Sequence, residues 1–255
     1  MYPETLFVIL DYQVNLYRLI LIVDFAVLLP LAWRLARERS VQKRVVFLGW
    51  GIAIGSALLG GYTLPHIAYA YDQNLPYSWS LGAIIAVAIS LSAYALWLGK
   101  RVANRRETFD ILAPCIAFAF ALGRLACFAA GCCNGKPAEG VPWAVTFTDP
   151  ASASNYLDIP IHPTQLYESA GCLLILILLL VMFNRPNLKG TLIWVFFLCY
   201  GLLRFANEFF RGDTRTMVGV LSLNQWVCLV ASVTGCVIVF IHLAQFGSRR
   251  VVVAG

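Results

Sequence analysis

The chain has 255 residues, of which 60% are hydrophobic and only 13% are charged, and its mean hydropathy is +0.75. A water-soluble domain usually has about a quarter of its residues charged, so this composition excludes an ordinary soluble enzyme and favours a polytopic membrane protein. The formal net charge is +6. Its distribution along the chain follows membrane topology and requires no nucleic-acid partner.

Seven continuous apolar stretches are long enough to be membrane-spanning helices, because about 20 apolar residues cross the hydrocarbon core. Backbone polar groups in lipid must be paired within the segment, which favours helices, and the alternation typical of a membrane barrel is absent. Glu4 and Asp11, rather than a basic region, precede the first stretch, so a cleavable signal peptide is not expected there. We predict an all-α polytopic membrane protein, a single transmembrane domain over residues 1–255, with spans at 14–33, 46–70, 78–98, 109–130, 164–183, 190–210 and 220–246.

The basic residues predict the orientation of these spans. Thirteen of the nineteen Lys and Arg residues fall on one side, whereas Lys136, Arg211 and Arg215 fall on the other. Since basic loops stay in the cytoplasm, the N-terminus is expected outside and the C-terminus in the cytoplasm. The long connection 131–163 then lies on the outer face, and PWAVTFTDP within it predicts a short strand or hairpin.

Ionisable residues lie in the outer halves of two predicted spans, where such groups are costly and usually face a partner or a cavity. Arg124 lies late in the fourth span; a snorkelling side chain is the alternative, but GRLACF continues apolar beyond it. Arg204, Glu208 and Arg211 are spaced i, i+4 and i+7, so they share one helix face. These four side chains carry two positive charges in excess. They predict an anionic ligand with apolar tails, such as a phospholipid headgroup.

A further polar segment, IHPTQLYES, begins the fifth span. His162 is expected at the water interface, and Gln165, Tyr167 and Glu168 follow it into the membrane on different faces of the helix. A tyrosine at the interface is ordinary. Glu168 in an otherwise apolar helix is less so, and we expect it to be the counter-ion of one of the arginines.

Cys127, Cys132 and Cys133 form a C-x4-C-C pattern at the end of the fourth span. Zinc and iron–sulfur sites usually have C-x2-C pairs or nearby histidines, which this pattern lacks, so no metal is expected. Three interpretations are left open: packing as small hydrophobic residues, a disulfide or redox function in an oxidising outer compartment, and a catalytic thiol activated by Arg124. Gly135, just beyond the cysteines, allows the backbone to approach a ligand closely.

Five motifs in order, GRLACFAAGCCNGKP, PWAVTF, HPTQLYES, GLLRFANEFFRGDTR and LSLNQW, resemble the prolipoprotein diacylglyceryl transferase family from the fourth to the seventh span. Tyr17, in LYRLILIVDFAV, resembles the family's N-terminal segment more weakly. The resemblance implies transfer of the diacylglyceryl group of phosphatidylglycerol to the thiol of a prolipoprotein lipobox cysteine, with release of glycerol phosphate. It also implies a multi-pass protein of the bacterial cytoplasmic (inner) membrane, with its site towards the outer leaflet.

The resemblance also assigns roles by position. Arg124 matches the arginine of the family's first motif, and Arg204 and Glu208 match the arginine and glutamate of its RFxxEFxR motif, so these three would be catalytic. The arginines would neutralise the phosphate leaving group. The residues expected to contact substrate are Tyr17, Gly135, Arg211, His162, Gln165, Tyr167 and Glu168. The attacking thiolate comes from the acceptor, so neither a nucleophile of the enzyme nor a metal or other cofactor is expected.

The chain departs from the family pattern where a general base is expected. The family's His-Gly-Gly at the start of the third span would fall near residues 77–82, where the chain reads YSWSLG, and Cys127 and Cys132 replace the usual asparagine and glutamate of the first motif. His66 and His162 are candidate substitutes, because a neutral imidazole near pH 7 suits base catalysis. The alternatives are a diverged member acting on another acceptor and a non-catalytic phospholipid-binding membrane protein.

Overall fold

The computed structural model describes residues 5–9, 12–39, 105–213 and 216–254, together with short groups of positions between 42 and 59. By its internal contacts the chain divides into two compact units, one of residues 1–31 and 109–255 and the other of residues 32–108. Most of the predicted spans 46–70 and 78–98 lies outside the described residues, as do His66 and residues 77–82. The site described below belongs wholly to the larger unit.

Five helices among the described residues are long and apolar enough to cross a membrane. They are α1 (Leu16–Glu38), α4 (Arg105–Ala130), α5 (Thr164–Phe183), α6 (Leu192–Asn207) and α7 (Leu223–Ala254). Each overlaps a predicted span, and α5 has the predicted bounds. The prediction of a helical, polytopic membrane protein is therefore confirmed for these five segments.

Several helix ends differ from the predicted ones: α4 begins four residues earlier, at Arg105, and α7 continues eight residues further, to Ala254. α1 continues past residue 33 to Glu38, because Leu35 is buried and Arg34 pairs with Glu38 one turn later, at 3.2 Å. The predicted span 190–210 is not one α-helix, since α6 ends at Asn207 and a 3-10 turn, η2 (Glu208–Phe210), follows it. The prediction that Arg211 lies on the same helix as Arg204 is thus wrong.

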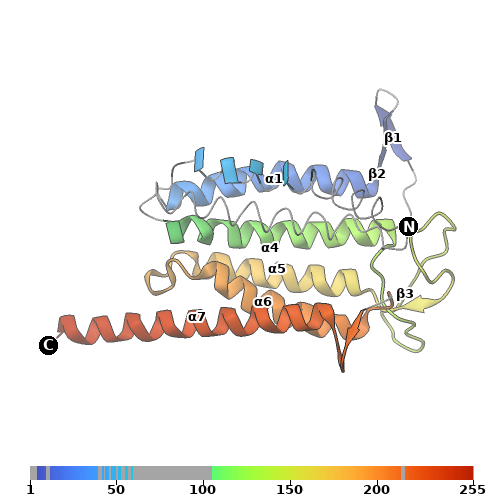
Figure 1. Cartoon of the computed structure of the whole chain (residues 1–255). Helices are drawn as coiled ribbons and strands as arrows, with labels where there is room; N and C mark the ends of the chain where they lie inside the picture. The colour runs from blue at the N-terminus through green and yellow to red at the C-terminus, as the bar shows by residue number, and fades with distance from the viewer. Residues whose placement is uncertain are drawn as a thin grey trace. The chain divides into compact units, whose positions relative to one another are not determined.

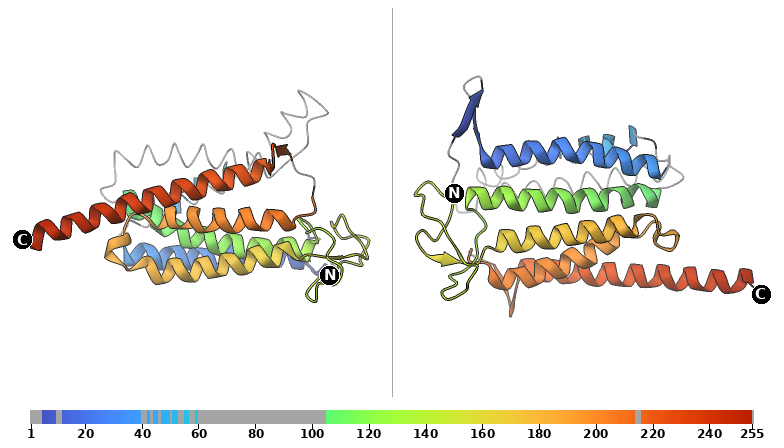
Figure 2. Two further views of the ribbon diagram at one scale, coloured as in Figure 1. Left: turned by 90° about the horizontal axis from the view of Figure 1, so that it is seen from below. Right: turned by 180° about the vertical axis from the view of Figure 1, so that it is seen from behind.

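Within the larger unit, α4, α5, α6 and α7 run side by side with alternating direction (Figures 1 and 2). α6 packs against both α5 and α7. Small residues permit the close contacts, as is usual for helices in membranes. A Cβ at Gly201 of α6 would lie 2.7 Å from the carbonyl oxygen of Cys228 on α7. Along α4, one face carries the fully buried alanines Ala113, Ala117 and Ala121.

Large apolar side chains cover the outside of these helices. Leu174 and Val181 of α5 are 68% and 61% exposed, and Val230 and Phe240 of α7 are 63% and 71% exposed. Water would make such a surface costly, whereas hydrocarbon does not. The exposed surface of the bundle therefore fits contact with lipid.

Short strands form the connections at one end of the bundle. In the 131–163 connection, β3 (Val145–Thr146) pairs antiparallel with β4 (Pro160–Ile161), which confirms the strand predicted in PWAVTFTDP. β5 (Met217–Val218) and β6 (Leu221–Ser222) form a small hairpin between η2 and α7. A hairpin of β1 (Thr5–Ile9) and β2 (Tyr12–Asn15) precedes α1 and was not predicted.

Candidate active site

Charged side chains from three helix ends meet beside the 131–163 connection. Arg124 comes from the last turns of α4, Glu168 from the first turns of α5, and Arg204 from the last turn of α6. Glu168 is 1% exposed and lies between the two arginines: Nε of Arg124 is 3.0 Å from its Oε1, and Nε of Arg204 is 3.9 Å from its Oε2. The prediction that Glu168 is an arginine counter-ion is confirmed, and a snorkelling Arg124 is excluded.

Neutral donors complete the surroundings of Glu168. The hydroxyl of Tyr200 donates to Oε1 at 2.7 Å, and Nδ2 of Asn207 donates to Oε2 at 3.1 Å. Both donors come from α6, four residues before and three residues after Arg204, so one helix face carries all three. A buried carboxylate needs this many donors to keep its charge, and here they fix its orientation.

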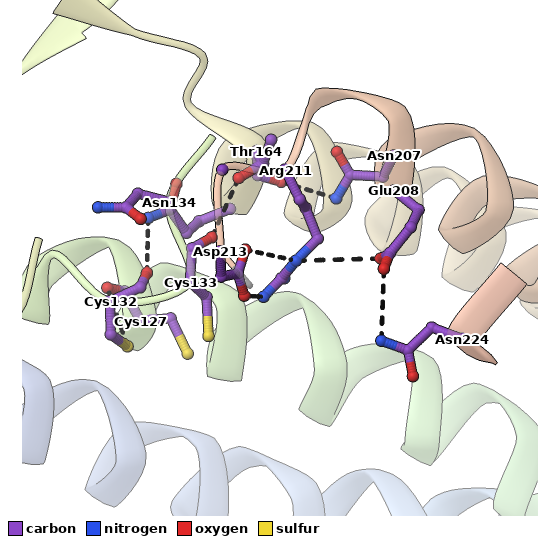
Figure 3. Close-up of polar contacts among 12 residues, drawn as sticks. Cys127, Cys132, Cys133, Asn134, Thr164, Asn207, Glu208, Arg211, Asp213 and Asn224 are labelled. Atoms are coloured by element: carbon purple, nitrogen blue, oxygen red, sulfur yellow. Dashed lines mark hydrogen bonds and ion pairs between the residues drawn. The ribbon is translucent and has the colours of Figure 1, made fainter. Parts of the chain in front are cut away.

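A second carboxylate, Glu208, is held directly after α6. Nη1 of Arg204 lies 2.6 Å from its Oε2, so Glu208 orients this arginine as predicted. The hydroxyl of Ser222 donates to Oε1 at 3.1 Å, and Nδ2 of Asn224 lies 3.4 Å from the same oxygen. Figure 3 shows Glu208 reached by Asn224 on one side and by Arg211 on another, where Nε of Arg211 is 3.9 Å from Oε2. The carboxylate thus ties the end of α6 to the start of α7.

The charges form an alternating row. Arg211 also pairs with Asp213, its Nε lying 3.1 Å from Oδ1 (Figure 3). With Glu168 and Asp213 included, three arginines face three carboxylates, so the predicted excess of two positive charges within this set is wrong. The sequence count omitted both acids, one on another helix and one beyond the end of α6. Glu168 contacts the Nε edge of Arg124, and a guanidinium carries further donors on its two other nitrogens.

The aromatic and polar residues of the α5 entrance form a separate group. Tyr167 accepts a hydrogen bond from Nε1 of Trp143 at 2.6 Å and lies 3.1 Å from Nδ1 of His162. Because the Tyr167 hydroxyl already accepts from Trp143, it is free to donate to a neutral His162. Burial, and then the charge of Lys136, lower the pKa of His162 below its ordinary value of 6.5. The imidazole is therefore neutral at pH 7.

Gly135 marks the crossing of three chain segments. Its N–H donates to the carbonyl oxygen of His162 at 3.1 Å, and the next N–H, of Lys136, donates to that of Phe210 at 2.9 Å. A Cβ at Gly135 would overlap the His162 carbonyl and lie 2.9 Å from that of Phe210. Gly135 thus permits a close approach to neighbouring backbone, and the predicted approach to a ligand stays a prediction.

The three cysteines of the C-x4-C-C pattern converge. Their sulfur atoms all lie within 4.8 Å of one another, and Figure 3 shows the three side chains close together. All eight cysteines lie among the described residues and are free thiols. Hydrogen bonds from Cys127 and Cys132 lower the pKa of Cys133, with Arg124 and then Arg211 acting in the same direction against burial. Sequence spacing alone did not predict this cluster.

A family model described as prolipoprotein diacylglyceryl transferase matches residues 4–241 of the chain. The chain belongs to the prolipoprotein diacylglyceryl transferase family. Relatives named phosphatidylglycerol–prolipoprotein diacylglyceryl transferase include one from Pseudomonas putida, 31% identical over 239 residues, or 82% of this chain and 84% of the relative. One from Leptothrix cholodnii is 29% identical over 94% of both chains. One from Clostridium tetani is 37% identical over 155 residues, and the match spans 60% of this chain and 59% of that relative.

Most residues that the resemblance to the prolipoprotein diacylglyceryl transferase family singled out lie around these two carboxylates and the loop beside them. Gln165 donates to the carbonyl oxygen of Cys132 at 2.7 Å, and so holds the loop that follows α4. Tyr17, at the start of α1, is 36% exposed. Its phenol is within electrostatic reach of the three clustered cysteines. His66 lies outside the described residues.

Several residues in contact with the site were not singled out from the sequence: Tyr200, Asn207, Asp213, Ser222 and Asn224. Two of them had a usable signal, since Tyr200 and Asn207 fall at helical spacing from Arg204. Ser222 and Asn224 reach Glu208 only because the β5–β6 hairpin turns the chain back, which no periodicity shows. Asp24, buried in α1, was also missed.

Proposed function

We propose that this protein transfers the diacylglyceryl group of phosphatidylglycerol to the thiol of the lipobox cysteine of a prolipoprotein, forming a thioether and releasing glycerol phosphate. Family membership over most of the chain supports the reaction class. The single observation that carries the proposal is the placing of Arg124 and Arg204 on either side of Glu168. Two guanidinium groups held on either side of one carboxylate suit the binding of a phosphodiester. Negative charge grows on its leaving oxygen as the carbon–oxygen bond breaks, and the guanidinium groups can stabilise that charge.

In this mechanism Arg124 and Arg204 bind the phosphate, and the carboxylates orient the arginines. Glu168 and Glu208 are each 1% exposed, so their contacts with the arginines are little screened by water. Guanidinium groups held before substrate arrives need no reorganisation during the reaction. Arg211, which contacts Glu208 and Asp213, completes the row and fits the glycerol phosphate end of the lipid.

The membrane topology is part of the proposal. Seven spans with the N-terminus outside and the C-terminus in the cytoplasm place the 131–163 connection, and with it the row of charges, at the outer leaflet of the bacterial cytoplasmic membrane. The distribution of Lys and Arg residues supports this orientation. A secreted prolipoprotein presents its lipobox cysteine on that side, where His162 is a candidate base.

The test is direct turnover. The purified protein in detergent is incubated with phosphatidylglycerol and a lipobox peptide, and mass spectrometry measures a diacylglyceryl adduct on the peptide cysteine. We expect the adduct with wild-type protein and with Arg34→Ala, whose side chain is 80% exposed, and none with Arg124→Ala.

Two outcomes would contradict the proposal. A product formed equally well by Arg124→Ala would exclude the phosphate-binding role of this arginine. No product from wild type, alongside an active relative such as the Pseudomonas putida enzyme, would favour another acceptor or a binding protein. The mass of lipid that copurifies with the protein would separate these two.

A further inference from the structure

Three thiols converge beside the arginines without any role in the mechanism above. Cys127 is in the last turn of α4, and Cys132 and Cys133 follow in the turn that leaves the helix. Their sulfur atoms lie within 4.8 Å of one another. Zinc–sulfur bonds of about 2.3 Å in a tetrahedral site place sulfur atoms about 3.8 Å apart, so small rotations of the side chains would close the cluster around one ion.

The backbone forms this cluster through contacts that do not involve sulfur. Cys133 adopts φ +57°, a left-handed conformation that non-glycine residues rarely adopt, and this brings adjacent side chains to one side. Two residues of α5 fix the turn: Thr164 donates to the carbonyl oxygen of Cys133 at 3.0 Å, and Gln165 to that of Cys132 at 2.7 Å. The thiols are therefore held in place before any ligand binds.

An unpaired acceptor lies beside the same turn. Gln165 is 1% exposed, and within the described part of the chain its Oε1 has no hydrogen-bond partner, although its Nε2 bonds to Cys132. A buried amide oxygen without a donor is unusual in a packed site. It would suit a backbone N–H of a peptide brought to the cluster.

The chemistry of the donor set favours zinc with one open position. Thiolates are soft ligands that select zinc and copper(I), and catalytic zinc sites have three protein ligands and a fourth position for water or substrate. A zinc ion with three thiolates has a net charge of −1, and Arg124 and Arg211 lie close enough to Cys133 to offset it. Arg124 and Cys127 are three residues apart on α4, so they share one face of that helix.

We propose that Cys127, Cys132 and Cys133 bind a zinc ion whose open position takes the acceptor thiol as a thiolate. This inference rests on the proposed function for its substrate and replaces the expectation, drawn from cysteine spacing, that no metal is present. A metal-bound thiol is deprotonated outright, so its proton passes to water without a dedicated base. The thiolate electron pair forms the sulfur–carbon bond, the carbon–oxygen bond to phosphate breaks, and its electron pair leaves on glycerol phosphate. Zinc keeps its oxidation state throughout.

The first measurement is metal content. Inductively coupled plasma mass spectrometry on protein purified under reducing conditions should give about one zinc per chain. The matched control is Cys199→Ser, a cysteine of similar partial burial on α6 outside the cluster, which should keep its zinc. The Cys132→Ser/Cys133→Ser variant should contain less than about one tenth of the zinc found in the wild-type protein.

A second measurement needs no cluster variant and so does not depend on one folding. Chelator-treated wild-type protein is titrated with cobalt(II), and the absorption of sulfur-to-cobalt charge transfer is recorded. We expect saturation at one cobalt per chain. A lipobox peptide should then change the ligand-field bands as its thiol becomes the fourth ligand, while the same peptide with serine in place of cysteine should not.

The outcomes separate this inference from the proposed function. Turnover by wild-type protein without zinc, or undiminished turnover by Cys132→Ser/Cys133→Ser, would overturn the zinc site and leave the transferase intact. A disulfide between two of the three cysteines in active protein would do the same. Cobalt binding with the thiol-specific change, but no diacylglyceryl adduct with the zinc form, would support the site and contradict the proposed function.

Discussion

The two ends of the helical bundle both bury carboxylates, but different donors hold them. At one end, fully buried Asp110 of α4 accepts hydrogen bonds from the backbone N–H groups of Gly190 and Leu192, at 2.5 and 2.8 Å. At the other, Glu168 and Glu208 contact arginine side chains. Backbone donors at the start of α6 cannot leave Asp110 unless the helix end itself moves. A guanidinium can rotate about its side chain and bind a phosphate with the donors that it does not share with glutamate.

This difference indicates a structural role for the Asp110 end and a role in ligand binding for the arginine end. The Asp110 end joins α4 to the connection between α5 and α6, so its loss should cost stability. At the arginine end, loss of a side chain should cost turnover. Substituting residues at each end, and measuring both turnover and the free energy of unfolding for each variant, tests that division.

After the complete loss of product expected for Arg124→Ala, the largest effect is expected at Arg204, which is shared by both glutamates. Arg204→Gln should lower kcat/KM about 10²- to 10³-fold, the usual loss when one donor to a developing oxyanion is removed. The kcat/KM of Arg204→Lys should lie between those of Arg204→Gln and wild type, because an ammonium group keeps the charge but lacks the paired N–H donors of a guanidinium. Initial rates of adduct formation measure both. If the kcat/KM of Arg204→Gln stayed within about threefold of wild type, the reacting phosphate would not bind at Arg204.

A mixed effect is expected for Gly135→Ala. The added Cβ overlaps the His162 carbonyl, so the crossing must open, at a cost of about 1–3 kcal/mol in the free energy of unfolding. Turnover should fall about tenfold because the α5 and α6 ends separate. Thermal unfolding and kcat/KM are compared with those of Gly140→Ala, a change in the same loop at a glycine that has φ +79° and no atom within 4 Å of its Cβ. An equal loss of kcat/KM in the two variants would exclude the crossing at Gly135 as its cause.

At the opposite end, Asp110→Asn should reverse the pattern. Loss of the charge that accepts two backbone N–H groups should lower the unfolding free energy by about 1–3 kcal/mol. Turnover at low temperature should stay within about twofold of wild type. The unfolding midpoint in detergent and the rate of turnover are measured on one preparation. A loss of turnover without a loss of stability would contradict the structural role of the Asp110 end.

The smallest effect should be the pH dependence of His162. Its pKa is lowered, so the neutral form is preferred in the folded protein, and the stability this provides is complete above pH 6.5 and declines as pH falls. Protonation removes the acceptor for the Tyr167 hydroxyl. The kcat/KM of the wild-type protein should therefore decline a few-fold as the pH falls below 6.5. In His162→Gln this decline should be smaller. Identical profiles for the two proteins would exclude His162 from the pH response.

The sequence predicted the helical part of this molecule well because apolar length is a strong signal in membranes. α5 has the predicted bounds, and Glu168 is paired as expected from the cost of a lone carboxylate in lipid. The local turns were harder to predict. Helical spacing from Arg204 suggested that Arg211 continued the helix, whereas η2 ends it at Asn207. The cysteine cluster depends on the left-handed Cys133, a single dihedral angle that composition and spacing do not record.

The backbone crossing at Gly135 has a consequence for how the protein evolves. Main-chain hydrogen bonds connect the segment after α4 to the entrance of α5 and to the exit of α6. Main-chain groups are the same in every residue except proline, so these bonds persist when the neighbouring side chains are exchanged. Side chains at positions 127, 132 and 133 can therefore change without loss of the main-chain bonds that hold the segment after Arg124. The architecture allows the acceptor chemistry to diversify around the phosphate site proposed at Arg124 and Arg204.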